Sequence, residues 1–177
     1  TGVYPEKVTK AVSIEGWGPP PQMLQEQPTH AYERMQHWVT EMRGFARRLP
    51  RHYKTLEEAV ERMRYANPHL SPEQARHLTL YGTNRNEDGT YTWKFDNYAR
   101  ARSPYRFNMD DAQEIWRRIT CPLLLIRGSE SWEADLEKDN RAKAFQNPEI
   151  VTIQKAGHWV HHDQLAEFLK ITQEFLA

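Results

Sequence analysis

His158 is the side chain of this sequence that is best placed to move a proton. It follows Gly157 and stands five residues after Ile153, which ends a short β-branched run. Gly157 permits a tight turn off that strand and presents the imidazole at the carboxyl edge of a parallel sheet, where open α/β folds bind ligands. An imidazole titrates near neutral pH, so it can take a proton from a nucleophile and return it to a leaving group. We therefore expect His158 to be catalytic, the alternative being a histidine that only caps or packs its loop.

A catalytic histidine needs a carboxylate that orients the ring and stabilises its charged form. Glu15 is one candidate, because it ends the apolar segment 8–14, where a buried carboxylate is costly without a partner. Glu130 is the other, in the loop after the apolar run 122–127. The alternative for Glu130 is a solvated carboxylate in an acidic loop. We favour Glu15 over Glu130 and keep both as candidates.

The pattern H-x-x-H-H, formed by His158, His161 and His162, raises a metal site as an alternative. The spacing is not that of a helical H-E-x-x-H, and no cysteine or carboxylate completes a strong ligand pattern. We predict neither a metal nor a cofactor, and we expect His161 and His162 to be surface or supporting residues.

Three apolar segments predict the strands that position these groups, at residues 8–14, 122–127 and 150–153. Periodicity and capping signals predict helices over residues 29–48, 55–66, 72–81, 110–119, 136–145 and 163–176. The alternation of strands and helices over 8–15 and 112–177 indicates a parallel sheet with crossover helices. The helical segment 19–107, which contains a short extended ribbon at 91–95, interrupts that alternation. We predict a cap or lid at 19–107 on a core formed by 1–18 and 108–177.

Composition bounds the classes of partner. The 177 residues are 38% hydrophobic with a mean hydropathy of −0.88, which is polar for a complete α/β domain with buried parallel strands. Lys and Arg together number 24, as do Asp and Glu, so nothing indicates a nucleic-acid or membrane-surface partner. The longest apolar run, residues 121–126, is too short to cross a bilayer. The single cysteine and the lack of a visible signal peptide favour a cytoplasmic protein.

In this order the elements resemble the second half of an α/β-hydrolase. Four stretches carry the resemblance: residues 4–8, residues 91–96 with 103–104, residues 119–128, and residues 156–164 with the last helix. They resemble, in turn, the link into the sixth strand, part of the lid, the seventh strand and the histidine loop. The resemblance implies an α/β fold containing the last three strands of the parallel sheet, an inserted helical lid and a small-molecule substrate. It makes five aromatic residues candidates for the walls of a substrate pocket: Trp17, Tyr91, Trp93, Phe95 and Trp132.

The resemblance also bears on the acid. Family members usually place it three residues after the glycine that ends the seventh strand, and here that position holds Ser131, which cannot carry the charge. Some members, including a subgroup of haloalkane dehalogenases, place the acid at the end of the sixth strand. Glu15 occupies that position.

The sequence departs from the family in one respect, because it contains no G-x-S-x-G nucleophile elbow. In chain order the nucleophile precedes the histidine, so we expect it before Thr1, together with the oxyanion hole. We interpret the chain as the C-terminal portion of a serine-type hydrolase that acts on an ester or similar acyl bond, inactive alone. Two alternatives stay open: a relative with an Asp nucleophile, such as an epoxide hydrolase or haloalkane dehalogenase, and a non-catalytic fragment or assembly partner.

A partner follows from the same resemblance. The sixth strand of the family lies beside the nucleophile strand, and without that neighbour residues 8–14 would form an open apolar edge that is prone to pairing. We predict that this edge pairs with the missing N-terminal half of the fold or with a second copy of the chain.

Overall fold

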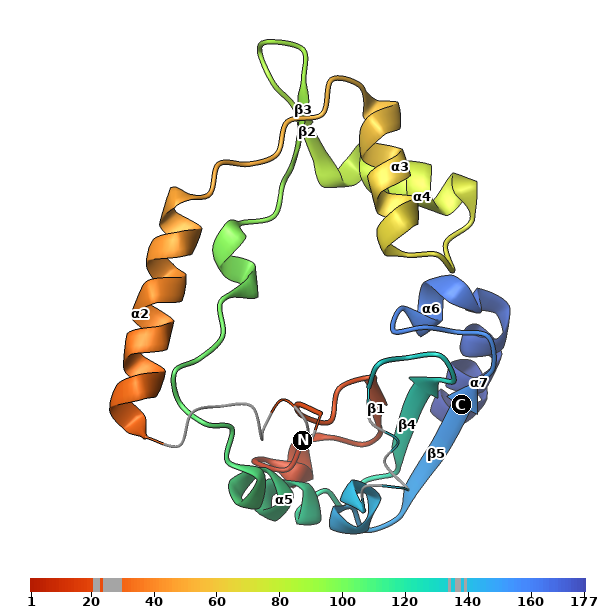
Figure 1. Ribbon diagram of the computed structural model, residues 1–177. Coiled ribbons are helices and arrows are strands. Elements are labelled where there is room, and N and C mark those ends of the chain that lie inside the picture. The colour runs from red at the N-terminus through yellow and green to blue at the C-terminus, as the bar shows by residue number, and fades with distance from the viewer. Residues whose placement is uncertain (21–22, 24–29, 134, 136–137, 139) are drawn as a thin grey trace. The chain divides into compact units, whose positions relative to one another are not determined.

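The computed structural model describes residues 1–20, 23, 30–133, 135, 138 and 140–177 (Figure 1). The chain divides into two compact units. Thr1–Glu26 and Phe107–Ala177 form the first, which we call the core unit, and Gln27–Arg106 form the second, which we call the insert unit. The predicted role of residues 19–107 as a lid stays a prediction.

The core unit is built on a three-stranded parallel sheet in the order β1-β4-β5. The strands are β1 (Ala11–Ile14), β4 (Leu123–Gly128) and β5 (Pro148–Ile153). This is the partial parallel sheet that the sequence predicts. Because all three strands run the same way, their carboxyl ends meet at one edge of the sheet.

The first strand is shorter than predicted. Residues Pro5–Lys7 form a 3-10 turn, η1, that is closed by a hydrogen bond from Val8 N–H to Pro5 O. Pairing with the neighbouring strand starts only at Ala11, whose N–H donates to Pro122 O. The β-branched composition of residues 8–10 therefore predicted strand where the chain is still completing a turn.

One face of the sheet packs against α5 (Met109–Arg117) and the chain around η3 (Arg141–Ala144). The buried side chains on this face are Trp17, Leu123, Leu125 and Phe145, with Trp116 of α5 packed against them. The Trp116 and Phe145 rings stack with centroids 5.1 Å apart. Trp17, which the sequence suggested as a pocket wall, is 1% exposed and part of this core.

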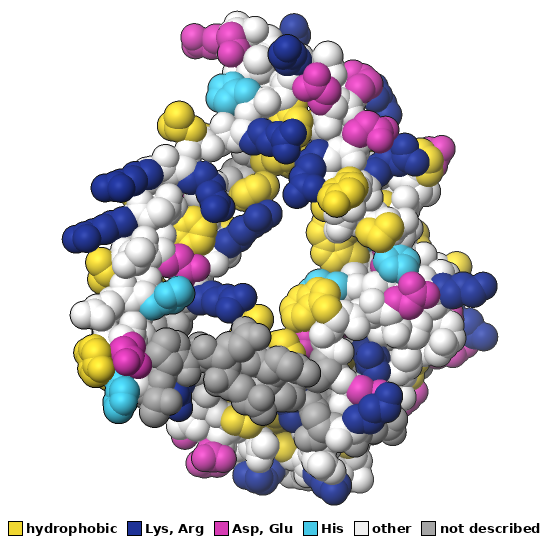
Figure 2. Space-filling model, viewed as in Figure 1, with side chains coloured by type: hydrophobic (Ala, Val, Ile, Leu, Met, Phe, Trp, Pro, Cys, Tyr) yellow, Lys and Arg dark blue, Asp and Glu magenta, His cyan; other side chains and the backbone are white. Residues whose placement is uncertain are grey.

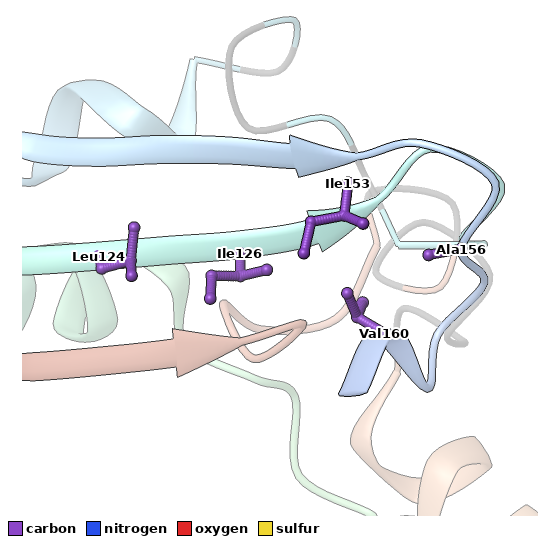
Figure 3. Packing of buried hydrophobic residues seen from close by; sticks show 5 residues of the cluster. All are labelled: Leu124, Ile126, Ile153, Ala156 and Val160. Carbon is purple, nitrogen blue, oxygen red and sulfur yellow. The ribbon is translucent and has the colours of Figure 1, made fainter. Parts of the chain in front are cut away.

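The opposite face packs against α6 (Val160–Asp163) and α7 (Leu165–Leu176). Its buried cluster, shown in Figure 3, consists of Leu124, Ile126, Ile153, Ala156 and Val160. Because residues 123–126 alternate between the two faces, β4 is buried on both sides, as a central parallel strand should be. Full burial of each large aliphatic side chain contributes about 1.5–3 kcal/mol to folding.

Two helix predictions in the core unit need correction. Within the predicted helix 136–145, residues 136–137 and 139 lie outside the described part of the chain, and the described end is the 3-10 turn η3. Asn140 before it is left-handed (φ 64°), which an α-helix cannot include. The predicted helix 163–176 is present as α7 but starts at Leu165, because Gln164 leaves the helical region (φ −134°, ψ 58°), and the short helix α6 before it was not predicted.

Over residues 30–106, the insert unit contains three helices and a hairpin: α2 (Ala31–Arg47), α3 (Leu56–Ala66), α4 (Pro72–Gly82), β2 (Thr83–Arg85) and β3 (Tyr91–Trp93), followed by the 3-10 turn η2 (Asn97–Arg100). Capping fixes two helix starts as predicted. Thr55 Oγ1 accepts from Glu58 N–H, and Ser71 with Gln74 forms a complete capping box. α3 and α4 pack on each other, and Ala59 of α3 and Ala75 of α4 are fully buried.

The surface of both units carries apolar side chains, which appear in yellow among the charged ones in Figure 2. No helix in the described part of the chain combines the length and apolarity needed to cross a membrane.

Candidate active site

Three loops converge at the carboxyl edge of the core sheet. Glu15 directly follows β1, residues 129–133 follow β4, and His158 lies in the loop after β5. Glu15 therefore meets two segments that follow it by more than 100 residues in the sequence.

Glu15 and His158 lie in contact. Oε2 of Glu15 is 3.2 Å from Nδ1 of His158. The glutamate side chain is 2% exposed, whereas the imidazole is 36% exposed. An ionised carboxylate can only accept, so Nδ1 donates the proton and a neutral ring carries its lone pair on Nε2. This tautomer is the one a general base requires.

Two further donors hold the Glu15 carboxylate. The backbone N–H of Gly128 donates to Oε1 at 2.5 Å, and the hydroxyl of Ser131 donates to Oε2. With His158 this makes three donors on two oxygens, so the charge is buried but not unpartnered, as a buried carboxylate must be. Its orientation is fixed from two neighbouring loops.

The backbone of Glu15 is strained. Its φ is 54°, in the left-handed region that a residue with a Cβ adopts at a cost of about 1–2 kcal/mol. Its N–H still donates to Ile126 O at 3.0 Å, so the backbone of Glu15 stays hydrogen-bonded to β4. The left-handed turn at this residue directs its side chain over the ends of the strands. Strain held by surrounding hydrogen bonds is common at functional sites.

The histidine loop is tied to the end of β4. A Cβ added to Gly128 would lie 2.3 Å from the carbonyl oxygens of Ala156 and Gly157, so only glycine permits this approach. Glu130 N–H donates to Ala156 O at 2.9 Å, and Asp163 Oδ2 accepts from Gly157 N–H at 2.8 Å. These contacts set where the imidazole of His158 stands.

The second predicted acid lies elsewhere. Glu130 is exposed on the loop after β4, with its backbone engaged by the histidine loop. Of the two glutamates, Glu15 is the one whose carboxylate the structure brings to Nδ1 of His158. The catalytic roles of all three residues stay predictions.

No model of a known protein family matches the chain. It is 24% identical, over 174 residues, to a serine hydrolase-like protein of Danio rerio, and it covers 48% of that protein. Among solved structures it is similar to a thioesterase domain from the curacin biosynthetic pathway, with a TM-score of 0.75, 21% identity, and 97% of this chain matched to 60% of that one. It is also similar to the Mycobacterium tuberculosis esterase Rv0045c, with a TM-score of 0.69, 18% identity, and 99% of this chain matched to 56% of that one.

The chain has part of the α/β-hydrolase fold. It spans about half the length of the curated relative and less than two thirds of each of these solved structures. The predicted equivalence of β1, β4 and β5 to the sixth, seventh and eighth strands of that fold, and of the His158 loop to its histidine loop, stays a prediction.

Two more residues lie against Glu15 and His158. Ser131 cannot carry the charge of an acid, but its hydroxyl donates to the Glu15 carboxylate. Trp132 was only one of five candidate wall residues, yet its ring lies 4.6 Å from the His158 ring and is 61% exposed. The signal for Ser131 was its position, where the family usually places its acid, and Trp132 is the next residue.

His161 and His162, which suggested a metal site in the sequence, follow His158 by three and four residues. The rings of His161 and His162 are 4.3 Å apart. Burial lowers the pKa of His161 below its ordinary value, and the neighbouring His162 adds to the lowering while Asp163 opposes it. Among the described residues, no group of three or more His, Cys, Asp or Glu side chains is placed to hold a metal ion.

Proposed function

We propose that this chain is the C-terminal portion of a serine-type α/β-hydrolase that cleaves an ester or similar acyl bond in a small molecule. The observation that carries the proposal is the hydrogen bond from His158 to the buried carboxylate of Glu15, at the carboxyl edge of the sheet. The similar proteins are a serine hydrolase-like protein, an esterase and a thioesterase domain, which supports this chemistry.

In the proposed mechanism His158 carries out the proton transfers and Glu15 orients it. Nε2 of His158 takes the hydroxyl proton of the nucleophilic serine as its oxygen attacks the substrate carbonyl, and the imidazolium then gives the proton to the leaving alcohol or thiol. Water repeats the sequence and frees the acid product. Throughout, the Glu15 carboxylate holds the Nδ1 proton and stabilises the positive ring.

The chain does not contain every part of this mechanism. No G-x-S-x-G motif occurs in its 177 residues, so the serine and its oxyanion hole would come from polypeptide outside this sequence. We propose that this polypeptide pairs with the outer edge of β1, and that the 177 residues alone do not turn over an ester.

A second candidate function has one observation in its favour. The acid stands after β1, the position that a subgroup of haloalkane dehalogenases uses. In that case an Asp nucleophile would form an ester with the substrate, and His158 would activate the water that hydrolyses it. The substrate would be a haloalkane or an epoxide.

The test uses the full-length protein that contains these residues. We expect it to hydrolyse p-nitrophenyl esters, and His158→Ala to lower kcat at least about 10³-fold because the remaining groups lack a base. A fluorophosphonate probe should label a serine outside the 177 residues. Halide release without such labelling would support the Asp nucleophile instead, and neither activity would support a non-catalytic role.

A further inference from the structure

Ser131 stands between the proposed acid and the rest of its loop. Its Oγ donates to Oε2 of Glu15 and accepts a hydrogen bond from the backbone N–H of Glu133 at 3.1 Å. A hydroxyl has a single proton, and the Glu133 N–H approaches its lone pairs. The Ser131 proton is therefore directed at Glu15, to the same oxygen that receives His158 Nδ1–H.

The strand order explains why the carboxylate needs such support. Glu15 follows β1 and His158 follows β5, with β4 between them. Neighbouring strands lie about 4.8 Å apart, so the glutamate side chain must cross the end of β4 to reach the imidazole. Gly128 and Ser131, which supply the other two donors, both belong to the end of β4 or the loop after it.

We propose that Ser131 is a positioning residue that holds the Glu15 carboxylate across the end of β4, in the orientation that fixes the His158 tautomer. Gly128 fixes one oxygen through its backbone, which no side-chain substitution can remove. Ser131 fixes the oxygen that faces the imidazole. The inference rests on the proposed function for its effect on catalysis, but the contact with Glu15 stands without it.

A matched pair of substitutions separates the hydroxyl from the volume of the side chain. Ser131→Thr keeps the hydroxyl, and Ser131→Val introduces a side chain of nearly the same shape as threonine but without the hydroxyl. In the full-length protein we expect Ser131→Val to lower kcat about ten- to hundred-fold with KM little changed, the effect of losing one hydrogen bond to a charged group. We expect Ser131→Thr to retain most of the activity. Ser129→Ala, which removes a hydroxyl that accepts from Lys155 N–H, controls for general loosening of the loop.

The ¹⁵N resonances of the His158 ring supply a readout that needs no activity. In Ser131→Val we expect the Nδ1–H signal to shift and to broaden through faster exchange, with smaller changes in Ser129→Ala. If the signal moves as expected but the wild-type protein hydrolyses nothing, the positioning role stands and the proposed function fails. If hydrolysis is present and Ser131→Val matches Ser131→Thr in both kcat and the Nδ1 signal, the positioning role is wrong. Equal losses in Ser131→Val and Ser129→Ala would also overturn it.

Discussion

Replacing Glu15 with glutamine changes the group that contacts His158 without changing its size. A carboxylate offers two acceptor oxygens to the three donors around it, whereas an amide offers one oxygen and an NH₂ group. If the NH₂ group replaces Oε2, it faces the imidazole and favours the tautomer with the proton on Nε2, which cannot act as a base. If it replaces Oε1, it faces the Gly128 N–H, which lies 2.5 Å from that position.

Either placement has a calculable consequence. The wrong tautomer costs about 10⁴-fold in kcat where the acid of a comparable triad becomes an amide, so we expect Glu15→Gln to lower kcat by about 10³- to 10⁴-fold. A donor that faces another donor in a buried site costs about 1–3 kcal/mol of stability. Steady-state hydrolysis of a p-nitrophenyl ester by the full-length protein measures the first effect, and chemical denaturation the second.

Two further variants make the reasoning refutable. Glu15→Asp keeps the charge but is one methylene too short to cross β4, so we expect a loss of activity close to that of Glu15→Gln. Glu130→Gln, in the exposed loop, should stay within about threefold of wild type. If Glu15→Gln keeps kcat within tenfold of wild type while Glu130→Gln or His158→Ala abolishes activity, Glu15 is not the catalytic acid.

Three other predictions concern packing and titration in the full-length protein. Gly128→Ala, which places a Cβ 2.3 Å from Ala156 O, should reduce the free energy of unfolding by about 1–3 kcal/mol and lower kcat, as melting curves and ester assays would show. Leu124→Ala, at a fully buried position, should cost about 2–5 kcal/mol in chemical denaturation, whereas Leu165→Ala, at a 51% exposed one, should cost far less. Because the pKa of His161 is lowered in the folded protein, the unfolded chain takes up that proton first as the pH falls below about 6.5, so stability decreases there. His161→Gln should flatten this part of the curve of melting temperature against pH. An unchanged slope would show that His161 is not the group responsible.

The fold was predictable where local patterns and tertiary structure agree. Residues 123–126 are a continuous apolar run, and only a strand buried on both faces uses such a run fully. The Ser71 capping box similarly set the start of α4. The errors fall at the ends of elements, as at Gln164, where a non-helical backbone delays the start of α7 to Leu165.

The site was harder to predict, because no sequence spacing fixes how far a side chain reaches across a sheet. Glu15 and Glu130 both follow an apolar strand, and the sequence left them as alternatives. The two residues differ in backbone conformation, because Glu15 is left-handed and Glu130 is not. The left-handed turn at Glu15 directs its carboxylate over β4 to His158. Ser131 could not be recognised as its partner, since the hydrogen bond depends on that same turn.

The outer edge of β1 determines whether a further strand completes the sheet. Ala11 N–H donates to Pro122 O and Glu15 N–H to Ile126 O, both on β4 or at its start. Peptide groups alternate in direction along a strand, so the N–H groups of Val12 and Ile14 point away from β4. Among the described residues, β1 has a strand neighbour only on the β4 side.

These two amides report directly on the proposed pairing. If polypeptide outside the 177 residues pairs with β1, the Val12 and Ile14 amides of the full-length protein should exchange with solvent deuterium as slowly as the Ser13 amide, which faces β4. A strand whose free edge is exposed would protect Ser13 alone, because an unpaired N–H exchanges without any opening of the sheet. Slow exchange at all three positions would support a nucleophile strand in the family's usual place. Fast exchange at Val12 and Ile14 beside a protected Ser13 would show that the edge is open, and the missing serine would then have to reach His158 by a different route.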